Sequence, residues 1–234
     1  MRIGVCIPCY APHILYLQST LASIEQQVRK PDIVSISISS YKDSEQIDTS
    51  KYSFPVVITS TSEKQCAGKN RNVAAEAIAS QVDILSFFDA DDLMHPRRLE
   101  ILEKHFIEHK LDSCIHYFMR GSVDSRNNIQ TIQWPNPSES IHLTGFTTGR
   151  DTICGRVWWS NERELGQCGQ ITVRSAIWNI HKYKERMVGE DSEYVWQVYT
   201  SGSKHAFLSD VLSMYIQNTE RFNNKDHFYT EMRM

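Results

Sequence analysis

The first half of the chain alternates between two hydrophobic periods. Ile3–Ile7 is a short apolar run, which is typical of a buried strand. The apolar residues after it recur every three or four positions, as on one face of an amphipathic helix that ends before Pro31. This stripe consists of Ile14, Leu17, Leu21, Ile24 and Val28. Beyond the proline, Val34, Ile36 and Ile38 alternate with serines, which predicts a half-buried strand.

Strand and helix patterns continue to alternate after this point. They predict a strand at Phe54–Ser60, an alanine-rich helix at Asn72–Ser80, and an apolar strand at Asp83–Asp92 that runs into an acidic cluster. Pro96 suits the first turn of a further helix. The apolar stripe of that helix consists of Leu99, Leu102 and Phe106. Repeated strand–helix units predict an α/β protein with a mostly parallel, Rossmann-like central sheet flanked by helices, which binds ligands beyond the carboxyl ends of its strands.

The second half is less regular. Gly121–Gly149 is rich in Asn, Ser, Pro and Gly with little periodicity, so we expect a long loop over the sheet. Further elements are expected as a strand at 152–159, a helix at 176–183, a helix from about Glu190 to Gly202, and closing strands at 205–208 and 211–216. Since no internal repeat appears, a single domain spanning residues 1–234 is the favoured organisation.

Composition and charge exclude several classes of protein. A chain of 234 residues buries a sizeable core without disulfides or structural metal, and a net charge of −3 argues against a dedicated nucleic-acid binder. No stretch approaches the roughly 18 apolar residues of a membrane span, and the N-terminal residues lack the long apolar core of a secretory signal. We therefore expect a soluble, cytoplasmic protein with no integral membrane segment, and the sequence leaves its oligomeric state open.

Cysteine spacing bears on redox chemistry, and histidine spacing bears on metal binding. Cys6 and Cys9 have the spacing of a redox pair, but Cys6 falls in the predicted apolar strand, where burial makes a thiol inert, and Cys9 is expected on the following loop. The nine histidines show neither H-x-x-H nor H-E-x-x-H spacing. We therefore expect no histidine-based zinc site.

The sharpest chemical signal is the acidic cluster Asp89, Asp91 and Asp92 at the end of an apolar strand. Three carboxylates in one place repel one another and are costly to desolvate unless a cation is present. Oxygen ligands suit Mg²⁺ or Mn²⁺, completed by water and substrate phosphates. The alternative is that Asp91 or Asp92 only caps the helix that begins at Pro96.

A second pair of carboxylates, Glu190 and Asp191, opens the helix predicted a hundred residues later. The helix dipole stabilises negative charge at this end, so such residues are common at ordinary helix starts. A functional role for this pair is favoured because it follows the acidic cluster in the chain.

Four motifs together resemble a family 2 glycosyltransferase of the GT-A fold. They are IPCY, GKNRNVAAEAI, DILSFFDADDLMHPRRLEIL and GEDSEYVWQVYTSGSK, and they cover about residues 1–217 in the expected order. The resemblance implies a metal-dependent, inverting transferase that moves a sugar from a nucleotide-diphosphate donor, usually a UDP-sugar, to a hydroxyl of a glycan or other acceptor. It also implies a nucleotide-sugar-binding half at 1–118 and an acceptor-binding and catalytic-base half at 119–234.

The resemblance assigns roles position by position. Pro8 and Tyr10 match residues that contact the nucleotide base, and Lys69 and Arg71 match basic groups near the nucleotide. Asp89 matches the carboxylate near the ribose, with Ala90 beside it, and Asp91 matches the metal ligand. The implied donor-binding set is thus Pro8, Tyr10, Ser39, Lys69, Arg71, Asp89, Ala90 and Asp91, with Asp91 and Asp89 as candidates for the metal. Asp191 matches the general base, which deprotonates the acceptor hydroxyl.

Two departures from the family pattern bear on specificity and metal binding. Where family members carry an acidic residue that reads the base, this chain has Ser39, and Asp43 is a substitute candidate. Where many members have a histidine metal ligand after the last strand, the match is Gln217; His227 or a water molecule are alternatives, and we favour water. For the acceptor, the expected contacts are Trp158, Trp159 and Glu190.

Two other functions remain open at this point. A D-x-D phosphatase or phosphotransferase would suit the acidic cluster, although Leu93 stands where such enzymes carry Thr or Val and earlier strands precede the cluster. A non-catalytic nucleotide-sugar-binding module would suit the fold. The single-domain layout also resembles transferases encoded by large DNA viruses, which would act in a host cytoplasm.

Overall fold

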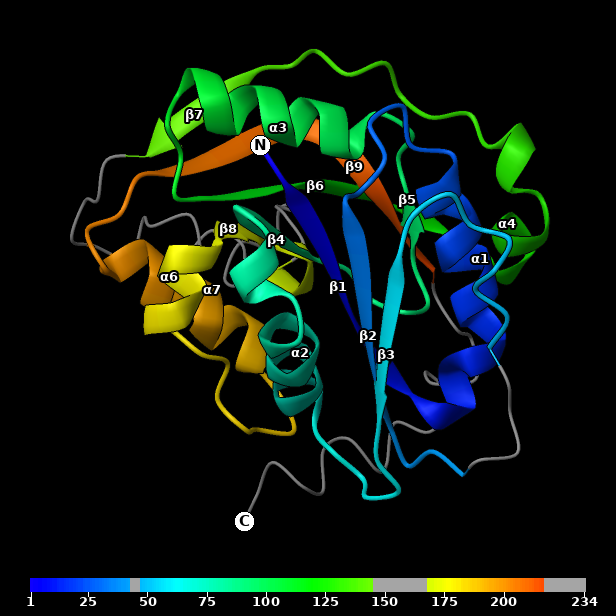
Figure 1. Cartoon of the computed structure of the whole chain (residues 1–234). Helices are drawn as coiled ribbons and strands as arrows, with labels where there is room; N and C mark the ends of the chain where they lie inside the picture. Colours follow the sequence, from blue (N-terminus) through cyan, green and yellow to red (C-terminus); the bar gives the residue numbers. More distant parts are fainter. Residues whose placement is uncertain (43–46, 145–167, 217–234) are drawn as a thin grey trace.

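A computed structural model describes residues 1–42, 47–144 and 168–216 (Figure 1). Its strands are β1 (Ile3–Tyr10), β2 (Ile33–Ser39), β3 (Val56–Ser60), β4 (Ile84–Phe87), β5 (Leu93–Met94), β6 (Ser113–Gly121), β7 (Ile141–Thr144), β8 (Thr172–Arg174) and β9 (His205–Ile216). Its α-helices are α1 (Ile14–Glu25), α2 (Ala67–Glu76), α3 (Arg98–Glu108), α4 (Val123–Asn127), α6 (Ser175–Ile180) and α7 (Glu190–Thr200).

The strands of the described ranges form one nine-stranded sheet in the order β3-β2-β1-β4-β8-β6-β9-β5, and β7 pairs with β9 outside that path. The long pairings are parallel, namely β3 with β2, β2 with β1, β1 with β4, and β6 with β9. The antiparallel pairings of β8, β5 and β7 are short. This confirms the expected α/β class with a mostly parallel central sheet.

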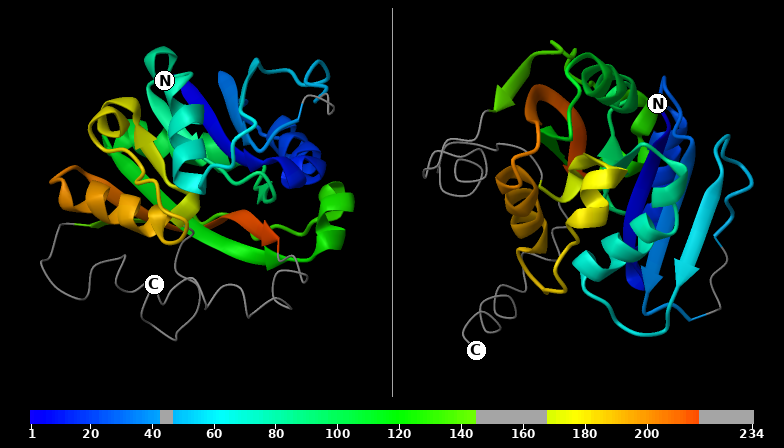
Figure 2. Two further views of the ribbon diagram at one scale, coloured as in Figure 1. Left: turned by 90° about the horizontal axis from the view of Figure 1, so that it is seen from below. Right: turned by 60° about the vertical axis from the view of Figure 1, so that its left-hand side comes forward.

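Helices cover both faces of the sheet, as the sequence predicts. One apolar cluster joins the sheet to α1 and α3, and a second joins it to α2, α6 and α7. The grouping of α2, α6 and α7 on one side is visible in Figure 1 and in the right-hand view of Figure 2. The predicted stripe of α3 is fully buried, as shown by Leu99, Leu102 and Phe106.

Two burial predictions were wrong. Strand β2 is buried on both faces, because α2 covers the serine side that the alternation pattern assigned to solvent; Ser35, Ser37 and Ser39 are all buried. Val28 is 66% exposed, because α1 already ends at Glu25 and the residue lies outside the helical stripe.

The cysteine pair lies inside a strand rather than across its end. Strand β1 runs to Tyr10, so the expectation that Cys9 lies on a loop was wrong, and both Cys6 and Cys9 are buried. The two thiols belong to different apolar clusters on opposite faces of the sheet. Burial raises the pKa of the Cys6 thiol far above its usual range. The pair is therefore a packing feature.

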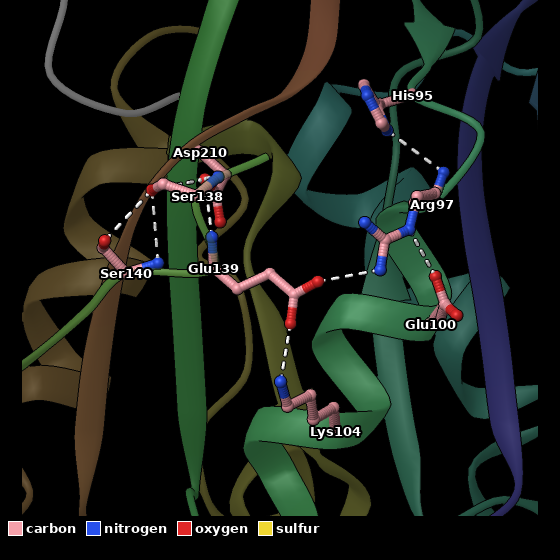
Figure 3. Close-up of polar contacts among 8 residues, drawn as sticks. All are labelled: His95, Arg97, Glu100, Lys104, Ser138, Glu139, Ser140 and Asp210. Carbon is pink, nitrogen blue, oxygen red and sulfur yellow. Dashed lines mark hydrogen bonds and ion pairs between the residues drawn. The ribbon is translucent and has the colours of Figure 1, made fainter. Parts of the chain in front are cut away.

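The segment expected as a long loop contains regular structure. It includes α4 and β7, and the turn before β7 is bound to α3 and β9 (Figure 3). Glu139 accepts hydrogen bonds from Arg97, just before α3 (2.8 Å), and from Lys104 of α3 (2.6 Å). Asp210 of β9 accepts from the backbone N–H of Ser138 at 2.6 Å. Ion pairs and hydrogen bonds therefore replace the hydrophobic periodicity that the sequence lacks here.

Smaller differences concern element bounds. The helix predicted at 72–80 begins at Ala67, and the two predicted closing strands are one strand, β9, whose register with β6 shifts near Tyr117. The strand predicted at 152–159 lies outside the described residues. Among the helices of the described ranges, none is long and apolar enough to cross a membrane.

Candidate active site

Polar residues gather where β1, β2 and β4 end. These strands are parallel, so Tyr10 at the end of β1 pairs with Ser39 at the end of β2, and Asp89 follows β4 at the same edge. Helix α2 packs on β1 and β2 and begins beside this edge. Its first turn therefore faces the acidic cluster, as expected for a ligand site in an open α/β sheet.

Asn70 joins α2 to the ends of two strands. Its side-chain N–H groups donate to the carbonyl of Cys9 (3.2 Å) and to the hydroxyl of Ser39 (2.9 Å). Its amide oxygen accepts from the hydroxyl of Ser37 at 3.2 Å. These bonds satisfy a buried side chain and fix the start of α2 against the sheet.

The neighbouring residues of the same turn bind the segment that precedes α7. Asn72 donates to the carbonyl of Tyr183 at 2.8 Å and accepts from its N–H at 3.0 Å. Lys69 lies 3.7 Å from Glu185 in an exposed ion pair. Gly68 permits the close approach, because a Cβ atom there would collide with the carbonyl oxygen of Lys184.

Arg71 joins the two acidic motifs that lie a hundred residues apart. One terminal nitrogen donates to Asp89 Oδ1 and the other to Glu190 Oε1, each at 2.7 Å. The guanidinium also lies over the ring of Tyr183, 5.4 Å from its centroid. Hydrogen bonds between a buried cation and carboxylates are charge-assisted and strong. The two bonds of Arg71 therefore fix the end of β4 relative to the start of α7.

The electrostatics of this edge place excess negative charge around one arginine. Burial raises the pKa of Asp89; Arg71 opposes that shift, and the charges of Asp91 and Asp191 add to it. Burial alone would lower the pKa of Arg71, but Asp89 and Glu190 together raise it well above its usual range. Asp91 and Asp191 therefore both act on Asp89, although Asp191 comes from a helix a hundred residues later.

Asp92 does not cap a helix, so the helix-cap alternative was wrong for this residue. It is fully buried, and its carboxylate accepts from the side-chain amide of Gln170 at 2.7 Å and from the backbone N–H of Ile216 at 3.0 Å. Helix α3 starts later, at Arg98, with no side-chain cap. Asp92 thus holds the end of β9 and the Cys168–Gln170 turn at the acidic cluster.

Asp91 is held through its backbone, which leaves its carboxylate at the surface of the site. Arg126 of α4 donates to the Asp91 carbonyl at 2.8 Å, and the Thr20 hydroxyl lies 2.8 Å from the carbonyl oxygens of both Ala90 and Asp92. The Asp91 side chain is 17% exposed and lies 3.9 Å from the ring of His13. Burial lowers the pKa of the Arg126 guanidinium and the Asp91 charge opposes that shift, so Arg126 acts on both the backbone and the charge of Asp91.

Asp191 lies in the first turn of α7, directly after the residue that binds Arg71. One carboxylate oxygen accepts from the backbone N–H of Ser192 (2.8 Å) and from its hydroxyl (3.1 Å). These bonds orient the carboxylate, and the N-terminal end of the helix favours its negative charge. Glu190 itself is buried against Arg71, so the acceptor contact expected of it has to compete with that ion pair.

The donor set suits an oxygen-ligated divalent cation. The repulsion of Asp89 by Asp91 and by Asp191 is the condition that such an ion relieves. Within the described ranges these three side chains do not form one compact three-ligand cluster. The arrangement therefore suits Mg²⁺ or Mn²⁺ taking one or two protein oxygens, with water and a substrate diphosphate completing its coordination.

The structure brings most predicted site residues to one edge of the sheet. Pro8 is buried in β1 and Tyr10, at the end of that strand, is 38% exposed. Ser39, Lys69, Arg71, Asp89, Ala90, Asp91, Glu190 and Asp191 lie at the same edge or on the elements bound to it. Asp43, Trp158, Trp159, Gln217 and His227 lie outside the described residues.

Sequence reasoning missed several residues that build this site. Asn70 and Asn72 stand in the same motif as Lys69 and Arg71, and two asparagines in a buried helical turn were a signal that their side chains bind backbone. Gln170 and Gly169 carried no such signal. A Cβ atom at Gly169 would lie 2.9 Å from Arg71 and 3.0 Å from Asp89, so the turn passes close to that ion pair.

Comparison with solved structures finds the same type of fold in S. aureus TarS. The S. aureus TarS 1–349 fragment in complex with UDP matches with a TM-score of 0.65 and 18% identity, over 95% of this chain and 62% of that one. The same fragment in complex with UDP-GlcNAc matches with a TM-score of 0.66 and 17% identity, over 93% and 59%. A longer TarS structure matches with a TM-score of 0.62, and there this chain spans only 38% of its neighbour.

At such identities the likeness shows the fold, and the expected GT-A type of fold is confirmed. No curated protein matches the chain. The sequence model of a family described as "Glycosyl transferase family 2" matches residues 4–179, which is more than half of the chain and includes β1, the α2 turn and the acidic cluster. The chain therefore belongs to glycosyl transferase family 2, as its motif series predicts.

Proposed function

We propose that this protein is a glycosyltransferase that moves a sugar from a UDP-sugar to a hydroxyl of a glycan or other acceptor, with inversion at the anomeric carbon. The observation that carries the proposal is the double ion pair of Arg71, which holds Asp89 and Glu190 at 2.7 Å each. It brings the carboxylates assigned to the donor next to the one assigned as base. The UDP and UDP-GlcNAc complexes of the S. aureus TarS fragment support a uridine nucleotide.

The donor would lie along the carboxyl edge of the sheet. Tyr10, which is 38% exposed at the end of β1, would contact the base, with Pro8 and Ser39 lining the strand ends beside it. Asp89 would bind the ribose, and Lys69 the phosphates. Arg71 is engaged with two carboxylates, so we assign it to positioning Asp89 rather than to direct contact with the nucleotide.

Asp191 would act as the general base. Its carboxylate is oriented by Ser192 and lies at the start of α7, where negative charge is favoured. It would take the proton of the acceptor hydroxyl as that oxygen bonds to the anomeric carbon and the bond to the donor diphosphate breaks. Fixed orientation of these groups supplies much of the rate increase in such displacements.

Asp91 and Asp89 would hold a Mg²⁺ or Mn²⁺ ion. When bound, this ion supplies the positive charge that stabilises the leaving diphosphate. Arg126 fixes the backbone of Asp91 through its carbonyl oxygen, so Asp91 is better placed than Asp89 to bind the ion. Water is the favoured further ligand, with Gln217 and His227 as alternatives, and Trp158 and Trp159 remain predicted acceptor contacts. The cytoplasmic location likewise stays a prediction.

The base assignment is tested by Asp191→Asn. We expect transfer to fall roughly 100-fold or more, the usual contribution of a general base, while UDP binding stays nearly unchanged. Glu193→Gln is the matched control: Glu193 lies in the same helical turn but is bound to Lys184 and Arg186, so its removal leaves transfer within about threefold. Undiminished transfer by the asparagine variant removes Asp191 from the mechanism.

The donor assignment is tested by thermal shift with UDP, GDP, dTDP and CMP, each with and without Mn²⁺. We expect UDP with Mn²⁺ to raise the melting temperature most, because a ligand that binds only the folded state stabilises it. A panel without any shift would reject a sugar-nucleotide site. Hydrolysis of phosphomonoesters without preference among nucleotides would favour a phosphatase instead, and nucleotide binding without transfer to any acceptor would favour a binding module.

A further inference from the structure

A second cluster of metal-binding side chains lies on α3, apart from the proposed catalytic edge. His105, Glu108 and His109 each offer a ligand atom, and these atoms lie within 4.8 Å of one another. The three residues occupy positions i, i+3 and i+4 of one helical turn, which places them on the same side of the helix. This spacing differs from H-x-x-H and H-E-x-x-H, whose absence from the sequence predicted no histidine-based zinc site.

His105 provides an independent sign of a missing partner. The residue is only 2% exposed, and neither of its ring nitrogens has a hydrogen-bond partner within the described part of the chain. A buried imidazole without a partner is costly, because both nitrogens lose their water. The ring stacks on that of His109, with centroids 5.5 Å apart and planes 22° apart, so it lies against the other ligands.

The charges around the cluster also suit a cation. The cluster lies at the C-terminal end of α3, where the unsatisfied carbonyls carry partial negative charge, and Glu108 adds a full one. Of the two lysines that flank the cluster in sequence, Lys104 is bound to Glu139 at 2.6 Å and Lys110 is exposed. Burial lowers the pKa of His105, with His109 and Lys104 adding to the effect, so the imidazole is neutral near pH 7 and able to bind a metal.

We propose that His105, Glu108 and His109 form a Zn²⁺ site, with two imidazole nitrogens and one carboxylate oxygen as protein ligands and water in the fourth position. Such a mixed nitrogen and oxygen set suits zinc, whereas the aspartate edge suits Mg²⁺ or Mn²⁺. Ligand atoms about 2.0–2.1 Å from one zinc ion lie about 3.4 Å apart, so small rotations of the exposed Glu108 and the half-buried His109 would complete the site.

The site would stabilise the last turn of the helix that carries Arg98 at its other end. All three ligands come from one turn, so the ion would hold that turn closed and supply the partner that His105 lacks. The proposal is independent of the proposed function, because none of its residues lies at the catalytic edge.

The test is calorimetric titration of the full-length, metal-free protein with ZnCl₂, in a background of Asp91→Asn that weakens metal binding at the acidic cluster. We expect one equivalent of zinc to bind. His109→Ala should weaken this binding roughly 100-fold or more, since even groups that only hydrogen-bond a metal ligand contribute about 10- to 100-fold. Glu108→Gln, an exposed substitution, should weaken it in the same direction.

His181→Ala is the matched control, because His181 is half-buried like His109 but lies beyond α6. It should leave zinc binding unchanged. Substitution with Co²⁺ gives a second readout, since the visible absorption of the histidine-bound ion should disappear with His109→Ala and persist with His181→Ala. Absence of zinc binding, equal affinity in the His109→Ala protein, or equal loss in both histidine variants would each overturn the proposal.

Discussion

Two buried arginines, Arg71 in α2 and Arg98 at the start of α3, are held in opposite ways. Arg71 has two carboxylate partners, Asp89 and Glu190, at 2.7 Å each. Arg98 is completely buried and has neutral partners: it donates to the Ser86 hydroxyl at 2.6 Å, among others. The remaining acceptors of Arg98 are His116 Nε2 (2.9 Å) and the carbonyl oxygens of Gln170 (3.0 Å) and Phe87 (3.4 Å).

The difference indicates that the Arg71 cluster is a candidate ligand site, whereas Arg98 has a structural role. Asp89 keeps 22% of its side chain exposed, so the Arg71 cluster is open to a ligand. Around Arg98, by contrast, burial lowers the pKa of the guanidinium to about 9, because its charge is removed from water without a carboxylate nearby. Burying the Arg98 guanidinium is costly, but its donors fix the backbone of Phe87 and Gln170.

Gln170 connects the two regions. Its carbonyl accepts from Arg98, and its side-chain amide donates to Asp92 at 2.7 Å. The preceding residue, Gly169, lies against Arg71 and Asp89. Arg98 therefore holds the Cys168–Gln170 turn, which itself contacts Arg71, Asp89 and Asp92.

The largest expected effect is that of Arg71→Met. Two buried or half-buried carboxylates would lose their cation, which costs about 3–5 kcal/mol of unfolding free energy, measured by urea unfolding at pH 7. The triple variant Arg71→Met, Asp89→Asn, Glu190→Gln should recover at least half of this loss, because amides tolerate the absence of a cation. If the triple variant is no more stable than the single one, charge pairing does not organise this region.

Arg98→Met should cost somewhat less, about 3 kcal/mol. Several buried acceptors lose their donor, at about 1–3 kcal/mol each, while removal of a buried charge offsets part of that cost. Arg97→Met is the matched control, since the adjacent Arg97 is exposed in surface ion pairs with Glu100 and Glu139, and its loss should cost no more than about 1 kcal/mol. Equal losses in the two variants would contradict the supporting role of Arg98.

The smallest effect is the part of the pH dependence of stability that comes from His116, the histidine bound to Arg98. His116 accepts from Arg98 through Nε2, so it must be neutral, and burial together with the charge of Arg98 holds its pKa well below 6.5. Its contribution to stability is then complete above about pH 6.5 and is lost as the pH falls below that value, by at most about 1.4 kcal/mol per pH unit. In urea unfolding between pH 7 and pH 5, His116→Gln should reduce this slope, whereas Arg71→Met should retain it.

The sequence predicts the charged region far better than its support. Asp89, Asp91 and Asp191 stand out because acidic residues next to apolar runs are unusual, and their order matches a family pattern. Arg98 gives no such signal, because a charged residue at a helix start is normally exposed. Its partner Gln170 is 72 residues away along the chain, and no local pattern brings them together.

The same limit explains the errors in the fold. Alternation of Val34, Ile36 and Ile38 with serines indicates one wet face, yet α2 covers that face and Asn70 binds two of its serines. Local periodicity reports how polar a face is, and only the tertiary structure decides whether a polar face is covered. The ion pairs of Glu139 replaced a predicted loop by an ordered turn for the same reason.

The turn Lys69–Asn72 has a consequence for how this protein can change. Its residues bind Glu185, the ends of β1 and β2, the Asp89–Glu190 pair and the Tyr183 backbone. Each added residue rotates a helix by about 100°, so a single insertion or deletion here would turn every later side chain away from its partner. Substitutions can adjust one contact at a time, but length variation cannot, and the turn should persist as an ungapped block in any working relative.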